Sequence, residues 1–168
     1  MYAIKGNHDG VDGREQALFE LPWSRCVLFC RPAVVETDEL VLLFLPWNRW
    51  RERQSLQELA SKLPDRQGRR TILVGHLELE ESDTDPACSM YRQGRFRFCL
   101  RDLDALSVDC LALGHFHVGD AHYLGSFRRT LVEENDPVGH GFCVLDSETG
   151  ASERFCIDAT GTVRSANG

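Results

Sequence analysis

The sequence predicts an α/β fold in which short apolar strands and helices alternate around a sheet. Apolar runs such as Leu40–Leu45 and Thr71–Val74 have the composition of buried strands, and a segment with leucines at helical spacing lies between them. Three predicted strands end at a glycine that Asn or His follows directly, at Gly6, Gly75 and Gly114. Because the carboxyl ends of parallel strands share one edge of an open α/β sheet, these exits predict a functional site at that edge.

The composition predicts one soluble domain that spans residues 1–168. With 42% hydrophobic and 27% charged residues, the chain is long enough for one core and too short for two large domains. No apolar run approaches the ~20 residues of a membrane span, and no secretory signal precedes Gly6, so we expect no membrane association and a cytoplasmic location. The net charge of −7 argues against a generally basic surface that coats nucleic acid, but not against an enzyme whose bound cations meet a phosphate.

The seven cysteines indicate reduced thiols. Their count is odd, they are scattered through apolar runs, and no Cys-x-x-Cys pair occurs. We therefore expect small buried side chains, and neither a disulfide framework nor a zinc knuckle.

The first half of the chain is predicted to hold two helices and five strands. Asp12 is the expected N-cap of a short helix over Arg14–Phe19. A capping-box pattern begins at Ser55, and leucines at helical spacing continue the second helix to Leu63. Apolar runs bounded by Gly, Pro or polar residues predict strands at Tyr2–Lys5, Val27–Phe29, Ala33–Glu36, Leu40–Leu45 and Thr71–Val74.

The second half begins with an acidic, turn-rich segment, residues 77–94, which predicts a long loop near His76. A short amphipathic helix over Arg101–Leu106 and a strand over Val108–Leu113 are expected next. The last residues, 160–168, are expected to be frayed. Alternating strand and turn signals predict three further strands, at Ala121–Leu124, Gly141–Leu145 and Arg154–Ile157.

Four neutral donors at the strand exits form a candidate metal site. His115 and His117 lie two residues apart, which places both side chains on one side of an extended chain. Asn7 and His76 follow the other two glycines, and we expect them to meet His115 and His117 at the same edge of the sheet. Imidazole and amide donors suit zinc, manganese or iron better than calcium, and carboxylates are expected beside them.

His8 remains as a candidate general acid next to these donors. The alternative is that the histidines at the exits are surface residues at loop tips. We expect that alternative for His122 and His140, which do not follow a predicted strand and its glycine.

The exits taken together resemble a known family. Gly6-Asn7-His8-Asp9, Gly75-His76 and Gly114-His115-Phe116-His117 are similar, in order, to the later three signature blocks of the calcineurin-like metallophosphoesterases. The segments 109–117, 123–126 and 139–142 resemble the SbcD-type branch, the nuclease subunit of a double-strand-break repair complex. The likeness to the wider family covers roughly residues 2–146.

The resemblance implies a metallophosphoesterase-type four-layer sandwich, with two mixed β-sheets flanked by helices, and a centre of two divalent ions, Mn²⁺ or similar. Asn7, His76 and His115 would bind the second ion and His117 the first, while His8 would protonate the leaving oxygen. Two cations at such a centre stabilise the attacking and departing oxygens of an in-line displacement. A coiled-coil ATPase partner of SbcC type is also implied.

The sequence departs from the family at its start. The family begins with an Asp-x-His block and a Gly-Asp-x-x-Asp block, and neither stands before Gly6. We therefore expect an N-terminally incomplete domain that lacks roughly two βα units, with a crippled or single-ion site. Missing strands would expose a sheet edge and favour a homodimer or instability. A carboxylate ligand could come from any of five residues, and their spacing favours none of them over the others: Asp9, Asp12, Glu78, Glu80 and Asp120.

The function expected from these residues is that of a hydrolase, a metal-dependent phosphodiesterase that acts on DNA as an exonuclease or endonuclease in double-strand-break repair. One alternative keeps the catalysis and changes the substrate to a small nucleotide or another phosphoester. The other is an inactive, truncated phosphoesterase-like module that binds a partner or one metal ion weakly.

Overall fold

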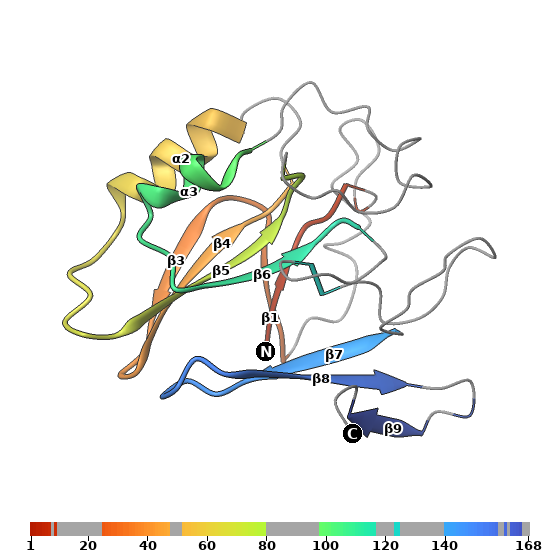
Figure 1. Ribbon diagram of the computed structural model, residues 1–168. Coiled ribbons are helices and arrows are strands. Elements are labelled where there is room, and N and C mark those ends of the chain that lie inside the picture. The colour runs from red at the N-terminus through yellow and green to blue at the C-terminus, as the bar shows by residue number, and fades with distance from the viewer. Residues whose placement is uncertain are drawn as a thin grey trace.

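Three sheets and two helices make up the part of the chain that the computed structural model describes (Figure 1). The described residues are 1–7, 9, 25–47, 52–79, 98–116, 123–124, 140–157, 160 and 162–165. In chain order the elements are β1 (Tyr2–Ile4), β2 (Val27–Phe29), β3 (Ala33–Glu36), β4 (Leu40–Leu45), α2 (Glu52–Ser61), β5 (Arg70–His76), α3 (Leu100–Asp104), β6 (Cys110–Gly114), β7 (Gly141–Leu145), β8 (Ser152–Ile157) and β9 (Val163–Ser165).

The central sheet has the strand order β3-β4-β5-β6, with β3 antiparallel to β4 and the other pairs parallel. Most residues of β4 and β5 are buried, which is why both strands have continuous apolar sequences instead of alternating ones. The register aligns Leu43 of β4 with Leu73 of β5, and Leu73 with Leu111 of β6. A row of leucines therefore crosses the sheet and ties its parallel strands together.

Both described helices cover one face of this sheet (Figure 1). Leu59 of α2 and Leu103 of α3 join Val41, Leu43 and Leu73 in the main hydrophobic core. Full burial of one such side chain contributes about 1.5–3 kcal/mol. The amphipathic spacing of the leucines in α2 thus serves to dock the helix on the sheet.

Aromatic rings cover the opposite face. Side chains alternate along a strand, so Phe44 of β4 points away from the side that Leu43 faces. Its ring stacks on Phe29 of β2, with centroids 4.3 Å apart, and meets Tyr2 of β1 at 5.4 Å. β1 and β2 form a separate parallel pair, so a two-stranded sheet packs on this face.

The third sheet consists of the antiparallel strands β7, β8 and β9. Its β7–β8 turn contacts the end of the central sheet where β4 and β5 begin. There Arg70 Nε donates a hydrogen bond to Glu148 O (3.1 Å), and Ser147 Oγ donates one to Glu39 (3.3 Å). These contacts lie at the end of the central sheet opposite to the end where β5 and β6 finish.

The predicted four-layer α/β sandwich is wrong. The described chain is richer in strand than in helix, it forms three small sheets, and its two helices lie on one face of the central sheet. A second large mixed sheet was expected on the face of Phe44, and the aromatic packing of Phe44 instead brings the two-stranded β1–β2 pair onto it, while β7–β9 form a separate antiparallel sheet. Motif residues at strand exits predict where strands end, and they do not predict what covers the faces.

Individual strands follow the sequence more closely. The strands predicted at Val27–Phe29, Ala33–Glu36, Leu40–Leu45 and Gly141–Leu145 are confirmed with these bounds. The expected fraying of residues 160–168 is wrong for Val163–Ser165, which pair with β8. The helix predicted at Arg14–Phe19 lies outside the described residues.

The described helices are short. None of them is long and apolar enough to cross a membrane.

Candidate metal centre at the carboxyl edge of the central sheet

The candidate site lies where β1, β5 and β6 end. Asn7 follows β1, His76 is the last residue of β5, and His115 follows β6. β5 and β6 are parallel neighbours, and their register places His76 opposite Gly114. The structure therefore brings together three of the predicted ligands, although Asn7 and His115 lie 108 positions apart in the sequence.

Asn7 and His76 are in direct contact. The Asn7 Oδ1 atom lies 2.8 Å from His76 Nε2, and because an amide oxygen carries no hydrogen, Nε2 donates. Two atoms bound to one transition-metal ion at about 2.1 Å lie roughly 3 Å apart. The spacing of Oδ1 and Nε2 therefore fits a shared cation, whose binding would replace the shared proton.

The His76 ring packs against two glycines. A Cβ at position 6 would lie 2.9 Å from His76 Cε1, and a Cβ at position 114 would lie 3.1 Å from His76 Nδ1. A side chain at position 6 would force a shift of neighbouring atoms, and one at position 114 would make a tight contact with the imidazole. The Gly-Asn and Gly-His patterns of the sequence thus have a packing cause: the ring of His76 lies against the backbone of both neighbouring exits.

His115 lies beside His76 in a strained backbone conformation. The two ring centroids are 5.3 Å apart with planes at 69°, and both ring nitrogens of His115 are shielded from solvent. The φ angle of His115 is +113°, which an L-residue adopts at a cost of order 1–3 kcal/mol. Strain of this kind persists where the surrounding packing fixes the residue, and it is common at functional sites.

Trp47 is a member of the site that sequence reasoning missed. It follows β4, and its ring stacks on His115 with centroids 5.1 Å apart and planes at 23°. The same ring meets His76 edge-on at 6.1 Å. The exit of β4 carries no Gly-His pattern in the sequence, and it is the structure that shows β4 to be a parallel neighbour of β5 that ends at the same edge.

Carboxylates do not complete the site within the described part of the chain. Among the described residues, no group of three or more His, Cys, Asp or Glu side chains is placed to hold a metal ion. Asp9 Oδ2 accepts a hydrogen bond from Gly6 N (2.8 Å) and so shapes the turn after β1. Glu78 is 4% exposed, and neither it nor Asp9 joins the two histidines in such a group.

One further histidine of the sequence lies elsewhere in the described structure. His140 lies just before β7, in the third sheet, where its carbonyl oxygen accepts from Ile157 N (2.8 Å). The general-acid candidate, one predicted ligand and three of the carboxylates fall outside the described residues: His8, His117, Asp12, Glu80 and Asp120.

Comparison with known proteins adds no relative. The sequence matches no protein-family model, and a search of curated proteins finds no significant match. The chemistry of the residues at the strand exits therefore carries the functional proposal.

Proposed function

We propose that this protein is a metal-dependent phosphodiesterase whose metal centre includes Asn7, His76 and His115. The observation that carries the proposal is the 2.8 Å contact between Asn7 Oδ1 and His76 Nε2, with the His115 ring beside it. Three neutral donors from three strand exits are chemically suited to a divalent transition metal, Mn²⁺ by the family resemblance.

The donor set supports one ion, and a second would require His117 and further ligands. When bound, a divalent ion supplies charge stabilisation at a phosphoryl oxygen and lowers the pKa of bound water. Asn7, His76 and His115 would hold the ion, each from a different strand exit. His8, next to Asn7 in the chain, is the residue we assign to donate a proton to the leaving oxygen.

We propose DNA as the substrate and double-strand-break repair as the setting, with a coiled-coil ATPase of SbcC type as partner. This part of the proposal rests on the signature blocks in the sequence. We also propose a cytoplasmic location, because the odd count and scattered positions of the seven cysteines do not form a disulfide framework.

A second candidate is a metal-binding module without turnover. The observation in its favour is that no carboxylate joins the histidines among the described residues. Two-ion phosphoesterase chemistry needs anionic ligands to offset the charge of the cations, so a site of neutral donors alone would bind one ion weakly.

The test measures Mn²⁺-dependent hydrolysis of bis-p-nitrophenyl phosphate and of linear duplex DNA, together with Mn²⁺ binding by calorimetry. His115→Ala should lose both metal binding and hydrolysis. His8→Ala should bind Mn²⁺ as wild type does and hydrolyse about 10²-fold more slowly or worse. His140→Ala, a histidine of the third sheet, is the matched control and should change neither.

The outcomes separate the candidates. Metal binding without turnover in the wild type selects the module, and preference for the small ester over DNA selects a small-substrate phosphodiesterase. Hydrolysis that is equal in wild type, His8→Ala and His115→Ala contradicts the proposal.

A further inference from the structure

We propose that Trp47 is a positioning residue of the metal centre, which holds the His115 imidazole in the orientation that lets it bind the same ion as His76. The inference rests on the proposed function for its metal-binding role. Its structural part, that the indole fixes His115, stands on contacts of the described residues alone.

The indole contacts both histidines in different ways. Its face stacks on His115, with planes at 23°, and it meets His76 at 89°, edge to face. The two imidazoles themselves lie at 69° to one another. One rigid ring therefore sets the orientation of both imidazoles, and a rotation of either ring would break an aromatic contact.

The backbone of Trp47 is hydrogen-bonded to the segment that follows β1 and leads to Asn7. Trp47 N donates a hydrogen bond to Lys5 O (2.8 Å), two residues before Asn7, and Lys5 N in turn donates to Phe29 O (3.0 Å). The preceding residue, Pro46, is buried and has a φ angle fixed by its ring. Trp47 thus connects the exits of β1, β5 and β6, which carry the three proposed ligands.

Stacking on the face of the His115 ring does not cover its ligand atoms. The lone pair of an imidazole nitrogen lies in the plane of the ring, so a bound ion approaches the ring edge. An indole on the ring face therefore restrains the imidazole without competing for its nitrogens. An aliphatic side chain in the same place would fill the space, but it would not offer a flat surface that selects one ring plane.

The strained backbone makes this restraint necessary. At φ +113° the backbone of His115 lies outside ordinary strand geometry. The orientation of its side chain is therefore fixed by the residues that pack on it. Phe116 also contacts the His115 ring, with centroids 5.0 Å apart and planes tilted by 52°. The Trp47 ring is the one that lies nearly parallel to the His115 ring, and it follows β4, whereas Phe116 is the neighbour of His115 in the chain.

The experiment compares Trp47→Leu, Trp47→Phe and the control Phe29→Leu with wild type. Phe29→Leu removes a different aromatic stack, that with Phe44, and so reports the effect of lost packing. The folded state of each variant is checked by urea unfolding. Metal affinity is measured with Mn²⁺ alone by calorimetry, and ligand geometry by the visible absorption of the Co²⁺ form.

We expect Trp47→Leu to weaken Mn²⁺ binding about tenfold or more, as for other groups that orient a metal ligand, and to alter the Co²⁺ spectrum. Trp47→Phe keeps a flat ring and should recover most of the affinity and the wild-type spectrum. Phe29→Leu should lose stability and keep both. Equal affinity in wild type and Trp47→Leu, or equal losses in Trp47→Leu and Phe29→Leu, would overturn the inference.

A second measurement on the metal-free protein separates this inference from the proposed function. A stacked indole shifts the His115 ring protons upfield in the NMR spectrum, and the signals are assigned with His115→Gln. The shift should be lost in Trp47→Leu and partly kept in Trp47→Phe. If the wild type binds no ion, the proposed function fails, and this shift still decides the positioning: identical His115 shifts in wild type and Trp47→Leu contradict it.

Discussion

At the scale of single residues, the site depends on glycines as much as on its ligands. A Cβ at Gly6 would lie 2.9 Å from the His76 ring, and a Cβ at Gly114 would lie 3.1 Å from it. The pattern of glycine followed by Asn or His could be recognised in the sequence because it reflects this local requirement. The contribution of Trp47 could not, because ring contacts between strand exits depend on tertiary packing.

Gly6→Ala should displace the His76 ring and weaken metal binding with little loss of fold. The new Cβ would lie 2.9 Å from His76 Cε1 and 3.2 Å from Asp9 Oδ2, so the ring must move away from Asn7. We expect Mn²⁺ affinity, measured by calorimetry, to fall about tenfold or more.

Gly68→Ala is the matched control for this change. Gly68 has φ +83°, and nothing lies within 4 Å of a Cβ built on it. Alanine there should cost about 1 kcal/mol of stability because of the backbone conformation, and leave metal binding as in wild type. Unaltered affinity in Gly6→Ala would contradict the packing described for His76.

At the scale of elements, strands were predicted better than helix starts and chain ends. Short apolar runs bounded by turn residues define β2, β3 and β4 at their observed bounds. The capping-box pattern at Ser55 misplaced the start of α2, which begins at Glu52 and buries Ser55 inside the helix. β9 was missed because Val163–Ser165 gain their order from pairing with β8, which a local pattern does not contain.

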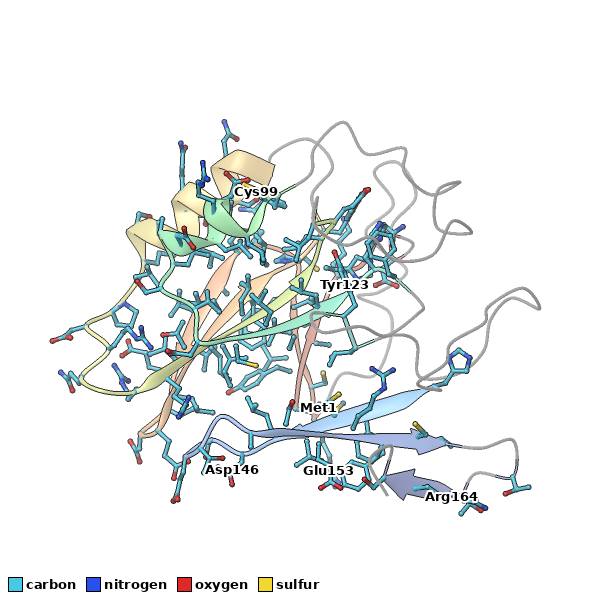
Figure 2. The ribbon with its side chains drawn as sticks, in the orientation of Figure 1. Met1, Cys99, Tyr123, Asp146, Glu153 and Arg164 are labelled. Carbon is cyan, nitrogen blue, oxygen red and sulfur yellow. The ribbon has the colours of Figure 1, made fainter. Side chains whose placement is uncertain are left out.

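Tyr123 fixes the chain just beyond β5 and is the clearest test at this scale (Figure 2). It is 1% exposed, and its hydroxyl donates to Leu77 O (2.9 Å) and accepts from Leu79 N (2.8 Å). Tyr123→Phe would leave both backbone groups buried without this partner. We expect a loss of about 1–3 kcal/mol in the free energy of unfolding by urea.

The control is Tyr2→Phe, at a tyrosine that is 45% exposed. Removing that hydroxyl should change stability by less than about 0.5 kcal/mol. Similar losses in the two variants would mean that the buried hydroxyl of Tyr123 does not hold the segment after β5.

At the scale of the whole molecule, local patterns were least informative. The sequence predicted two mixed sheets flanked by helices, whereas the described residues form three small sheets and two helices. Whether a helix or a β pair covers a face is decided by the shapes of side chains that meet across it, here Phe44 with Phe29 and Tyr2. Such contacts between residues far apart in sequence are not contained in periodicity.

The attachment of the third sheet should depend on pH through Asp146, at the β7–β8 turn (Figure 2). Hydrogen bonds from Thr149 and Glu148 and the charge of Arg70 lower the pKa of the Asp146 carboxyl below its ordinary value of 3.8. Because the folded-state pKa is lowered, the stabilisation is complete above the unfolded pKa and is lost as the pH falls through the folded one.

Asp146→Asn should therefore be less stable than wild type near neutral pH, and this difference should shrink as the pH falls below the ordinary carboxyl pKa of 3.8 and through the lowered folded-state pKa. Urea unfolding at a series of pH values measures it. Glu153→Gln, which removes an exposed carboxylate of β8, shows how much of the change is a general effect of charge. A difference between wild type and Asp146→Asn that stays constant across the acid range would contradict the prediction.

The backbone at His115 has one further consequence. Its φ of +113° is a conformation that glycine adopts freely, so folding alone would favour glycine at this position. His115→Gly should relieve strain while it opens a space shaped like an imidazole beside Trp47. Free imidazole added to the solution can occupy such a space, so the missing ligand can be restored from outside, and chemistry and folding can be separated at a single residue.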